Sequence, residues 1–136
     1  MVNYCCLFVE TLFLGLIVSG GYRSDTSVEI ILEDGTGYSL PDLPAPRYLH
    51  TMNGLLICGG GSYSLTSSTC TTLSDTGSWV TSHTLAARRR DHVSWDTGDG
   101  TLLLGGEDYD AYKSSELLST TTSNSSLSFT LPYSTS

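Results

Sequence analysis

Two cysteines in the middle of the chain are the side chains whose spacing first suggests covalent chemistry. Cys58 ends a short apolar run, and Cys70 lies among threonines in the next run that favours a β-strand. If these runs are the two strands of one hairpin, the cysteines can face each other at a disulfide distance. A disulfide would place the protein in an oxidising compartment, whereas the alternative is a pair of buried free thiols. We predict the disulfide.

The histidines and acidic residues do not form a metal-binding pattern. His50 and His92 recur at matching positions of a repeat described below, and no Cys-x-x-Cys or His-x-x-x-His spacing is present. The acidic residues 107–110 lack the Asp or Asn and the Gly that continue an EF-hand loop, so we expect a solvated loop there. A Gly-x-Ser-x-Gly nucleophile elbow is also missing. We therefore expect no metal, no other cofactor and no enzymatic activity.

The composition favours a β-sheet surface and argues against a nucleic-acid partner. Charged residues make up 15% of the chain, against a usual value of about 25%. The formal net charge is −8, whereas phosphate binding needs a basic surface. Arg88, Arg89 and Arg90 form the only basic cluster. They either contact an anionic ligand or lie in a solvated loop with one arginine paired to a local acid.

The stretch from residue 53 to residue 79 is the clearest structural unit in the sequence. Its apolar run ends at the glycine pair Gly59 and Gly60, which lets the chain turn with positive φ and lets neighbouring backbone approach. A polar segment then leads to a returning strand at Thr69–Leu73. After a turn, Trp79 begins a third strand, which we expect to end at Thr84. The unit therefore predicts antiparallel strands joined by short connections.

The same order of features recurs, more weakly, on both sides of this unit. Apolar runs end at glycine pairs that begin at positions 20, 59 and 105, and each pair precedes a second strand-like run and a later aromatic residue. The segments that lead into two of the units also match, because residues 47–50 and 89–92 both carry Arg three positions before His. The corresponding residues are Gly20, Gly21 and Tyr38 upstream and Gly105, Gly106 and Phe129 downstream.

This pattern resembles the kelch family, in which a hydrophobic run, a double glycine, a later aromatic residue and an Arg-x-x-His segment repeat every 40–50 residues or so. The aromatic residue that this family has in the returning strand is absent from all three copies. The resemblance implies an all-β fold made of four-stranded β-propeller blades, which we place at residues 1–45, 46–87 and 88–136. Because a closed propeller needs about 4–8 blades, we expect a fragment of a larger propeller, or a chain that assembles with another.

The ends of the chain bear on localisation. Residues 1–20 are either a secretion signal or, as we prefer, the first two strands of the first blade, at residues 4–9 and 14–19. Their apolar length is below the ~20 residues of a membrane span. Residues 119–128 form a long polar segment that we expect to be a loop, and Asn124 within it begins a glycosylation sequon. With a Cys before the glycine pair and another in the next strand, the chain resembles some extracellular invertebrate kelch-like proteins, which favours secretion, with a cytoplasmic location as the alternative.

Since propellers present their loops on one rigid face, the resemblance implies a protein-interaction module without enzymatic activity. The partner is then another protein or the remaining blades of the propeller. The alternative is a fragment of a galactose-oxidase-like propeller enzyme whose catalytic residues lie outside this chain. The residues that we expect to contact a partner are Tyr63, Arg88, Tyr109 and Tyr112.

Overall fold

A computed structural model describes residues 15–22, 25–107, 114–119 and 126–130 of the chain. Within these residues the protein is all-β, with eleven strands and no helix. The all-β expectation is thus confirmed. No part of this described structure is an apolar helix of the length that a membrane crossing requires.

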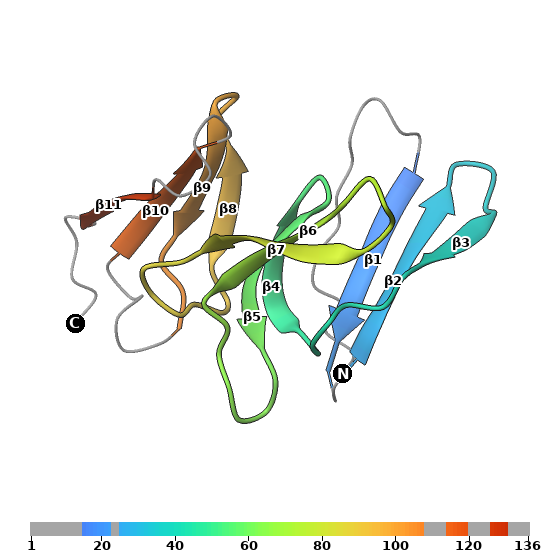
Figure 1. The fold of residues 1–136 in the computed structure, drawn as a ribbon, viewed down its shortest axis with the longest axis horizontal. Coiled ribbons are helices and arrows are strands. Elements are labelled where there is room, and N and C mark those ends of the chain that lie inside the picture. The colour runs from blue at the N-terminus through green and yellow to red at the C-terminus, as the bar shows by residue number, and fades with distance from the viewer. Residues whose placement is uncertain (1–14, 23–24, 108–113, 120–125, 131–136) are drawn as a thin grey trace.

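The strands form three antiparallel sheets that follow one another along the chain (Figure 1). Sheet I has the strand order β1-β2-β3, sheet II has the order β4-β5-β6-β7, and sheet III has the order β8-β9-β10-β11. Each sheet is a meander, because every strand pairs with the next strand in sequence. The strands are β1 (Gly15–Gly21), β2 (Asp25–Leu32), β3 (Gly37–Leu40), β4 (Tyr48–Asn53), β5 (Leu56–Gly61), β6 (Thr69–Leu73), β7 (Trp79–Thr84), β8 (Val93–Asp96), β9 (Gly100–Leu104), β10 (Ser114–Ser119) and β11 (Ser126–Thr130).

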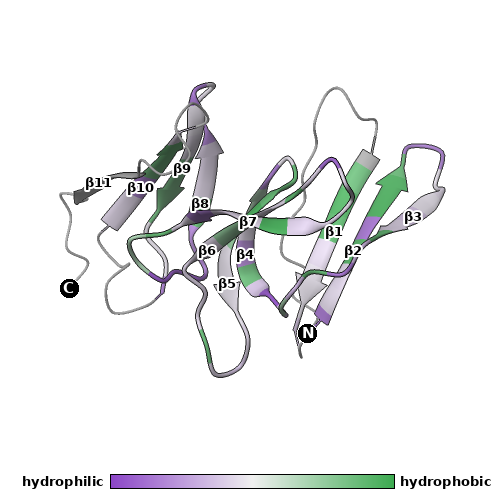
Figure 2. Cartoon of the chain, in the orientation of Figure 1, coloured by the Kyte–Doolittle hydropathy of each residue, from purple (hydrophilic) through white to green (hydrophobic). Residues whose placement is uncertain are grey.

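Apolar side chains fill the spaces between successive sheets. Alternate residues of a strand point to opposite faces of its sheet, so sheet II contributes to two separate cores. Ile57 packs with Val28 and Met52 between sheets I and II. Leu103 and Leu118 pack with the two cysteines of sheet II between sheets II and III. Figure 2 shows the apolar stretches along β1, β2 and β9 that supply much of this packing.

The central unit of the sequence folds largely as predicted. The returning strand β6 and the third strand β7 have the predicted bounds. The strand β5 differs, because it continues through the glycine pair to Gly61 instead of ending before it. Its glycines remain in the ladder since Gly59 pairs with His50 and Gly61 pairs with Tyr48 across the sheet.

Two expectations about the ends of the chain have different outcomes. The expected polar loop at residues 119–128 is wrong in part, because β11 begins at Ser126 and pairs with β10. The alternation of Leu127 and Phe129 with polar residues is the strand signal that this expectation missed. The strand expected at residues 4–9 lies outside the described residues.

Candidate binding surface

Arg47 belongs to the segment that leads from sheet I into sheet II, and it is buried between them. Its backbone N–H donates to the Asp25 carbonyl of sheet I at 3.4 Å. Its guanidinium donates into sheet II, to the Gly59 carbonyl at 2.8 Å, the Thr69 carbonyl at 2.9 Å and the Thr71 hydroxyl at 3.1 Å. Burial lowers the pKa of Arg47 from its ordinary value. The residue therefore links two sheets through polar contacts within a dry interface.

Arg89 occupies the matching position between sheets II and III. It donates to the Gly105 carbonyl at 2.7 Å and to the Glu116 carboxylate of β10 at 2.7 Å. Both side chains of this ion pair are almost fully buried. The same carboxylate accepts the backbone N–H groups of Ala86 and Ala87. The expectation of a solvated loop with one arginine paired to a local acid does not describe Arg89, because Arg89 and Glu116 are both buried. It does describe Arg90, which pairs with Glu107 in a half-exposed contact.

The two histidines of the Arg-x-x-His segments also lie between sheets. His50 and the Ser19 hydroxyl of sheet I are 2.8 Å apart, and His92 and the Thr51 hydroxyl of sheet II are also 2.8 Å apart. Burial and the nearby arginine of the same segment lower the pKa of His50 to about 4 and that of His92 to about 3. Both histidines are therefore structural groups held neutral at pH 7.

The backbone of these segments repeats as closely as their side chains. Leu49 and Asp91 have φ values of 55° and 53°, which is a left-handed conformation that is uncommon for residues other than glycine. The Asp91 N–H donates to the Leu49 carbonyl at 2.8 Å, so the equivalent positions of two repeats are directly bonded. The Gly60 N–H donates to the Arg89 carbonyl at 2.9 Å, and the Gly21 N–H donates to the Arg47 carbonyl at 3.0 Å. We call residues 47–50 and 89–92 the lead-in segments. Each lead-in segment therefore binds the glycine pair of the sheet before it.

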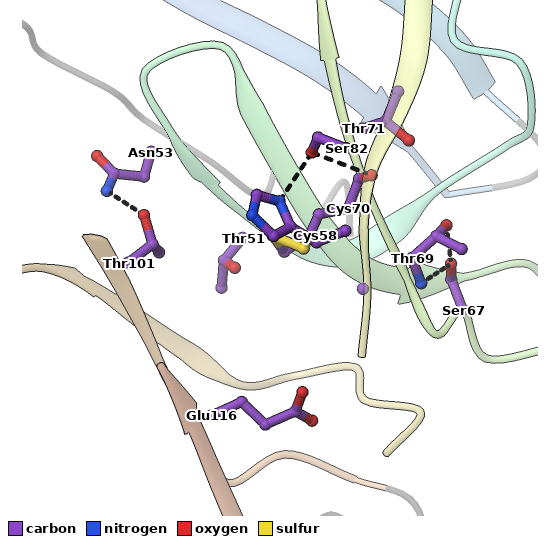
Figure 3. Close-up of a disulfide and its surroundings, with 12 residues drawn as sticks. Thr51, Asn53, Cys58, Ser67, Thr69, Cys70, Thr71, Ser82, Thr101 and Glu116 are labelled. Atoms are coloured by element: carbon purple, nitrogen blue, oxygen red, sulfur yellow. Dashed lines mark hydrogen bonds between the residues drawn. A yellow bond between two sulfur atoms is a disulfide. The ribbon is translucent and has the colours of Figure 1, made fainter. Parts of the chain in front are cut away.

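A disulfide joins Cys58 on β5 to Cys70 on β6 (Figure 3). The two residues are register partners on adjacent strands, with their Cα atoms 4.1 Å apart. Both cysteines are buried in the core between sheets II and III. The bond spans 12 residues and closes the loop at residues 62–68 at its base. The structure thus has the bond that the cysteine spacing suggested.

Three tyrosines gather at one end of sheets I and II, and we call Tyr22, Tyr48 and Tyr63 the tyrosine cluster. The rings of Tyr22 and Tyr48 are 6.0 Å apart and nearly perpendicular, and the Tyr22 and Tyr63 rings are 5.4 Å apart. The Tyr22 and Tyr63 hydroxyls are hydrogen-bonded, which raises the pKa of Tyr63. Tyr22 is 49% exposed and Tyr63 is 66% exposed. The cluster therefore offers aromatic faces to solvent.

Arg90 extends this surface toward sheet III. Its guanidinium donates to the Tyr48 hydroxyl at 3.4 Å and lies 3.5 Å from the Glu107 carboxylate, in a half-exposed ion pair. Of the three consecutive arginines, Arg90 thus reaches the tyrosines, Arg89 is buried and Arg88 is exposed. The arginines have three separate environments and do not form one basic patch.

A cavity of about 300 Å³ adjoins the loop that carries Tyr63. Its walls come from Pro46 and Arg47 of the lead-in segment, from the loop at residues 62–68, and from Arg88. Arg88 forms no salt bridge with any described residue. The cavity therefore combines an apolar wall with one cation that is available to a ligand or partner group.

The predicted site residues fall into three groups in the structure. Tyr63 and Arg88 lie on the surface just described. The glycines of the three pairs all have positive φ, and Trp79 is a structural residue whose indole N–H donates to the Pro41 carbonyl at 2.6 Å. Cys58 and Cys70 form the disulfide described above. Three predicted sites lie outside the described residues: Tyr109, Tyr112 and Asn124.

Sequence reasoning missed Tyr22, Tyr48 and Arg90 as members of this surface. A signal was present for Tyr22 and Tyr63, because each follows closely after a glycine pair in its own repeat. Tyr48 and Arg90 are likewise matched, since each is the second residue of an Arg-x-x-His segment. Comparing equivalent positions between repeats could therefore have found the cluster.

The described residues contain no group of three or more His, Cys, Asp or Glu side chains that could hold a metal ion. Comparison of the sequence with models of known protein families and with curated proteins finds no match in either case.

Proposed function

We propose that this chain is a kelch-type β-propeller module in which sheets I, II and III are consecutive blades. The support is the repetition of one inter-sheet contact. Arg47 and Arg89 each form a backbone hydrogen bond with the preceding sheet or its loop, and each guanidinium donates to the following sheet. The histidine three residues after each arginine contacts a hydroxyl of the preceding sheet. Such repetition between successive meanders, of three described strands in sheet I and four in sheets II and III, is what radial packing of blades requires.

The module binds another protein through the tyrosine cluster and the neighbouring cavity. This is the observation that carries the functional proposal: exposed aromatic rings, the exposed Arg88, which pairs with no described acid, and a concave surface lie around one loop. Tyrosine and arginine are the residue types that dominate binding energy at protein interfaces. Arg88 beside the cavity favours a partner that presents a carboxylate there, because an arginine fork matches a carboxylate in geometry and charge.

The disulfide supports a location in an oxidising compartment, outside the cytoplasm. Such bonds form and persist in secreted and extracellular proteins and are rare where thiols are kept reduced. The Cys58–Cys70 bond is buried in the core between sheets II and III. Secretion therefore accompanies the proposed binding role.

The test is a comparison of two tyrosine variants in partner capture. Immobilised wild-type protein and the Tyr63→Ala and Tyr38→Ala variants are exposed to the medium and extracts of the source cells, and captured proteins are quantified by mass spectrometry. Tyr38 is a matched control because it is 60% exposed, against 66% for Tyr63, but lies on β3 away from the cluster. We expect Tyr63→Ala to reduce specific capture at least tenfold, as for an interface hot spot.

Equal capture by all three proteins, with equal thermal melting curves, would reject this surface as the binding site. A further variant, Arg88→Ala, separates the cavity from the aromatic faces. A carboxylate-presenting partner is contradicted if Arg88→Ala binds as tightly as wild type while Tyr63→Ala does not.

A further inference from the structure

Each contact between successive sheets uses the same two faces, so the outermost faces can be compared with buried equivalents. We call the face turned toward the preceding sheet the leading face, and the opposite one the trailing face. In sheets II and III the centre of the leading face is a cross-strand pair with at most 1% exposure: Ile57 with Thr71, and Leu103 with Glu116. The equivalent pair in sheet I is Val18 with Glu29, where Glu29 is exposed.

The trailing face shows the same contrast at the other end of the molecule. In sheet II, Thr51 and Asn53 of β4 are covered by sheet III, to which they are bonded through His92 and Thr101. Strand register places Val93 and Trp95 of β8 at the equivalent positions in sheet III. These two side chains are 61% and 66% exposed. Sheet III thus exposes apolar side chains where sheet II is covered.

The glycine pairs give an independent measure of which faces are filled. A Cβ atom added to Gly20 would lie 2.2 Å from the Arg47 carbonyl oxygen, and one added to Gly59 would lie 2.4 Å from the Arg89 carbonyl oxygen. At Gly105, the equivalent position of sheet III, no described residue comes within 4 Å of such an atom. The backbone conformation is nevertheless the same, with φ near +60° at all three. Sheet III therefore has a site shaped for a following lead-in segment, with no described residue in it.

We propose that two copies of this chain assemble head to tail, with the trailing face of sheet III of each copy against the leading face of sheet I of the other. This inference rests on the proposed propeller fold. Among the described residues, no sheet covers the leading face of sheet I or the trailing face of sheet III, and the same two kinds of face already pack against each other twice within the chain. Two copies of the three described sheets give a ring of six, which is within the range of about 4–8 blades of closed propellers. Such a ring has the two-fold symmetry that is commonest among protein oligomers.

Both outer faces carry apolar side chains, and the leading face also carries the Glu29 carboxylate. Val93 and Trp95 would be buried against Val18 and the half-exposed Ile31 of the second copy. A buried tryptophan contributes a large apolar area and is a residue type enriched among interface hot spots. Both faces are also free of Lys and Arg at the positions named, so the contact does not bring two cations together.

The experiment measures the mass of the native protein by sedimentation equilibrium over a wide range of concentration. We expect a reversible dimer at twice the chain mass of 14.6 kDa. A denaturing gel without reductant, run on the same sample, shows whether any dimer is instead covalent through other cysteines. Two variants address the two faces: Trp95→Lys on the trailing face, and Glu29→Trp on the leading face, where the buried equivalents are smaller.

Both variants should raise the dimer dissociation constant at least 30-fold or so, the size of an interface hot-spot loss. Tyr38→Lys is the control, because Tyr38 is 60% exposed, against 66% for Trp95, but pairs with Ile30 on the opposite face of sheet I from Glu29. This variant should leave the dissociation constant unchanged. If Trp95→Lys does not fold by circular dichroism, Val93→Lys addresses the same face.

A single-chain mass at every concentration overturns the proposal, as does a dimer that only reductant dissociates. A dimer weakened by Trp95→Lys but not by Glu29→Trp overturns it too, since two trailing faces would then be paired. None of these results changes the outcome expected for Tyr63→Ala in partner capture, so failure of the assembly and failure of the binding role are distinguishable.

Discussion

At the scale of single residues, two neighbouring arginines show how burial determines the effect of an ion pair on the free energy of unfolding. Arg89 and Glu116 are almost completely buried, whereas Arg90 and Glu107 are 33% and 51% exposed. A half-exposed pair contributes about 0–1 kcal/mol, because water screens the charges and the side chains lose entropy when they meet. Removal of one partner from a buried pair leaves the other charge without compensation in a dry site.

Glu116→Ala should therefore lower the free energy of unfolding by about 3–5 kcal/mol. It leaves the Arg89 guanidinium without its carboxylate and the Ala86 and Ala87 N–H groups without their acceptor. Glu107→Ala, the matched control, should cost less than about 1 kcal/mol. Urea unfolding followed by tryptophan fluorescence measures both values. Equal effects of the two substitutions would show that the Arg89–Glu116 pair is not the anchor between sheets II and III.

Sequence reasoning at this scale found the types of the important residues but not all of their partners. The Arg-x-x-His spacing marked Arg47 and Arg89 as equivalent, and the glycine pairs were expected to have positive φ. Nothing local marked Glu116, because it is 27 residues from Arg89 and lies on a strand of the next sheet. A pairing of this kind depends on how sheets stack, which short-range patterns do not encode.

At the scale of strands and their connections, the glycine pairs combine two demands in one position. Gly59 needs a positive φ and also a close approach to the Arg89 carbonyl. Gly54 has a similar φ of +59°, but no described residue lies within 4 Å of a Cβ atom added there. Comparing the same substitution at the two sites separates backbone strain from packing.

Strand bounds such as those of β6 and β7 were predictable from β-branched runs and turn residues, while the continuation of β5 through Gly61 depends on pairing with β4.

Gly54→Ala should cost about 1–2 kcal/mol, the penalty of a left-handed conformation for a residue with a Cβ atom. Gly59→Ala should cost about 1–3 kcal/mol more, because its Cβ would also overlap backbone atoms of the next lead-in segment. Thermal and urea unfolding of the two variants provide the comparison. If the two alanines have the same effect, the close approach between sheets is not required for stability.

At the scale of the whole molecule, both neutral histidines lie in interfaces between sheets. His50 lies between sheets I and II, and His92 lies between sheets II and III. Their pKa values fall to about 4 and about 3 in the folded protein, whereas an unfolded histidine titrates near pH 6.5. Below pH 6.5 the unfolded chain therefore binds protons that the folded protein does not, and the stability of the fold must fall with pH.

The expected loss between pH 7.5 and pH 5 is about 2 kcal/mol for each histidine, and it continues until the pH passes the folded-state pKa values. Urea unfolding at a series of pH values measures the loss, and the proteins to compare are wild type and His50→Gln. The variant should show about half of the wild-type slope over this range. A free energy of unfolding that is constant from pH 7.5 to pH 5 would mean that the histidines are not held neutral between the sheets.

The disulfide has a consequence for how this molecule could diverge in evolution. Cys58 and Cys70 fix the two strands at the base of the loop that carries Tyr63, independently of what the loop itself contains. Since the entropic cost of loop closure rises only slowly with length, insertions and substitutions at the tip of this loop, next to Tyr63, are largely separated from the contacts that Gly59, Gly60 and Thr69 make between the sheets. A lineage could therefore exchange one recognition loop for another here while the surrounding sheets remain under unchanged selection.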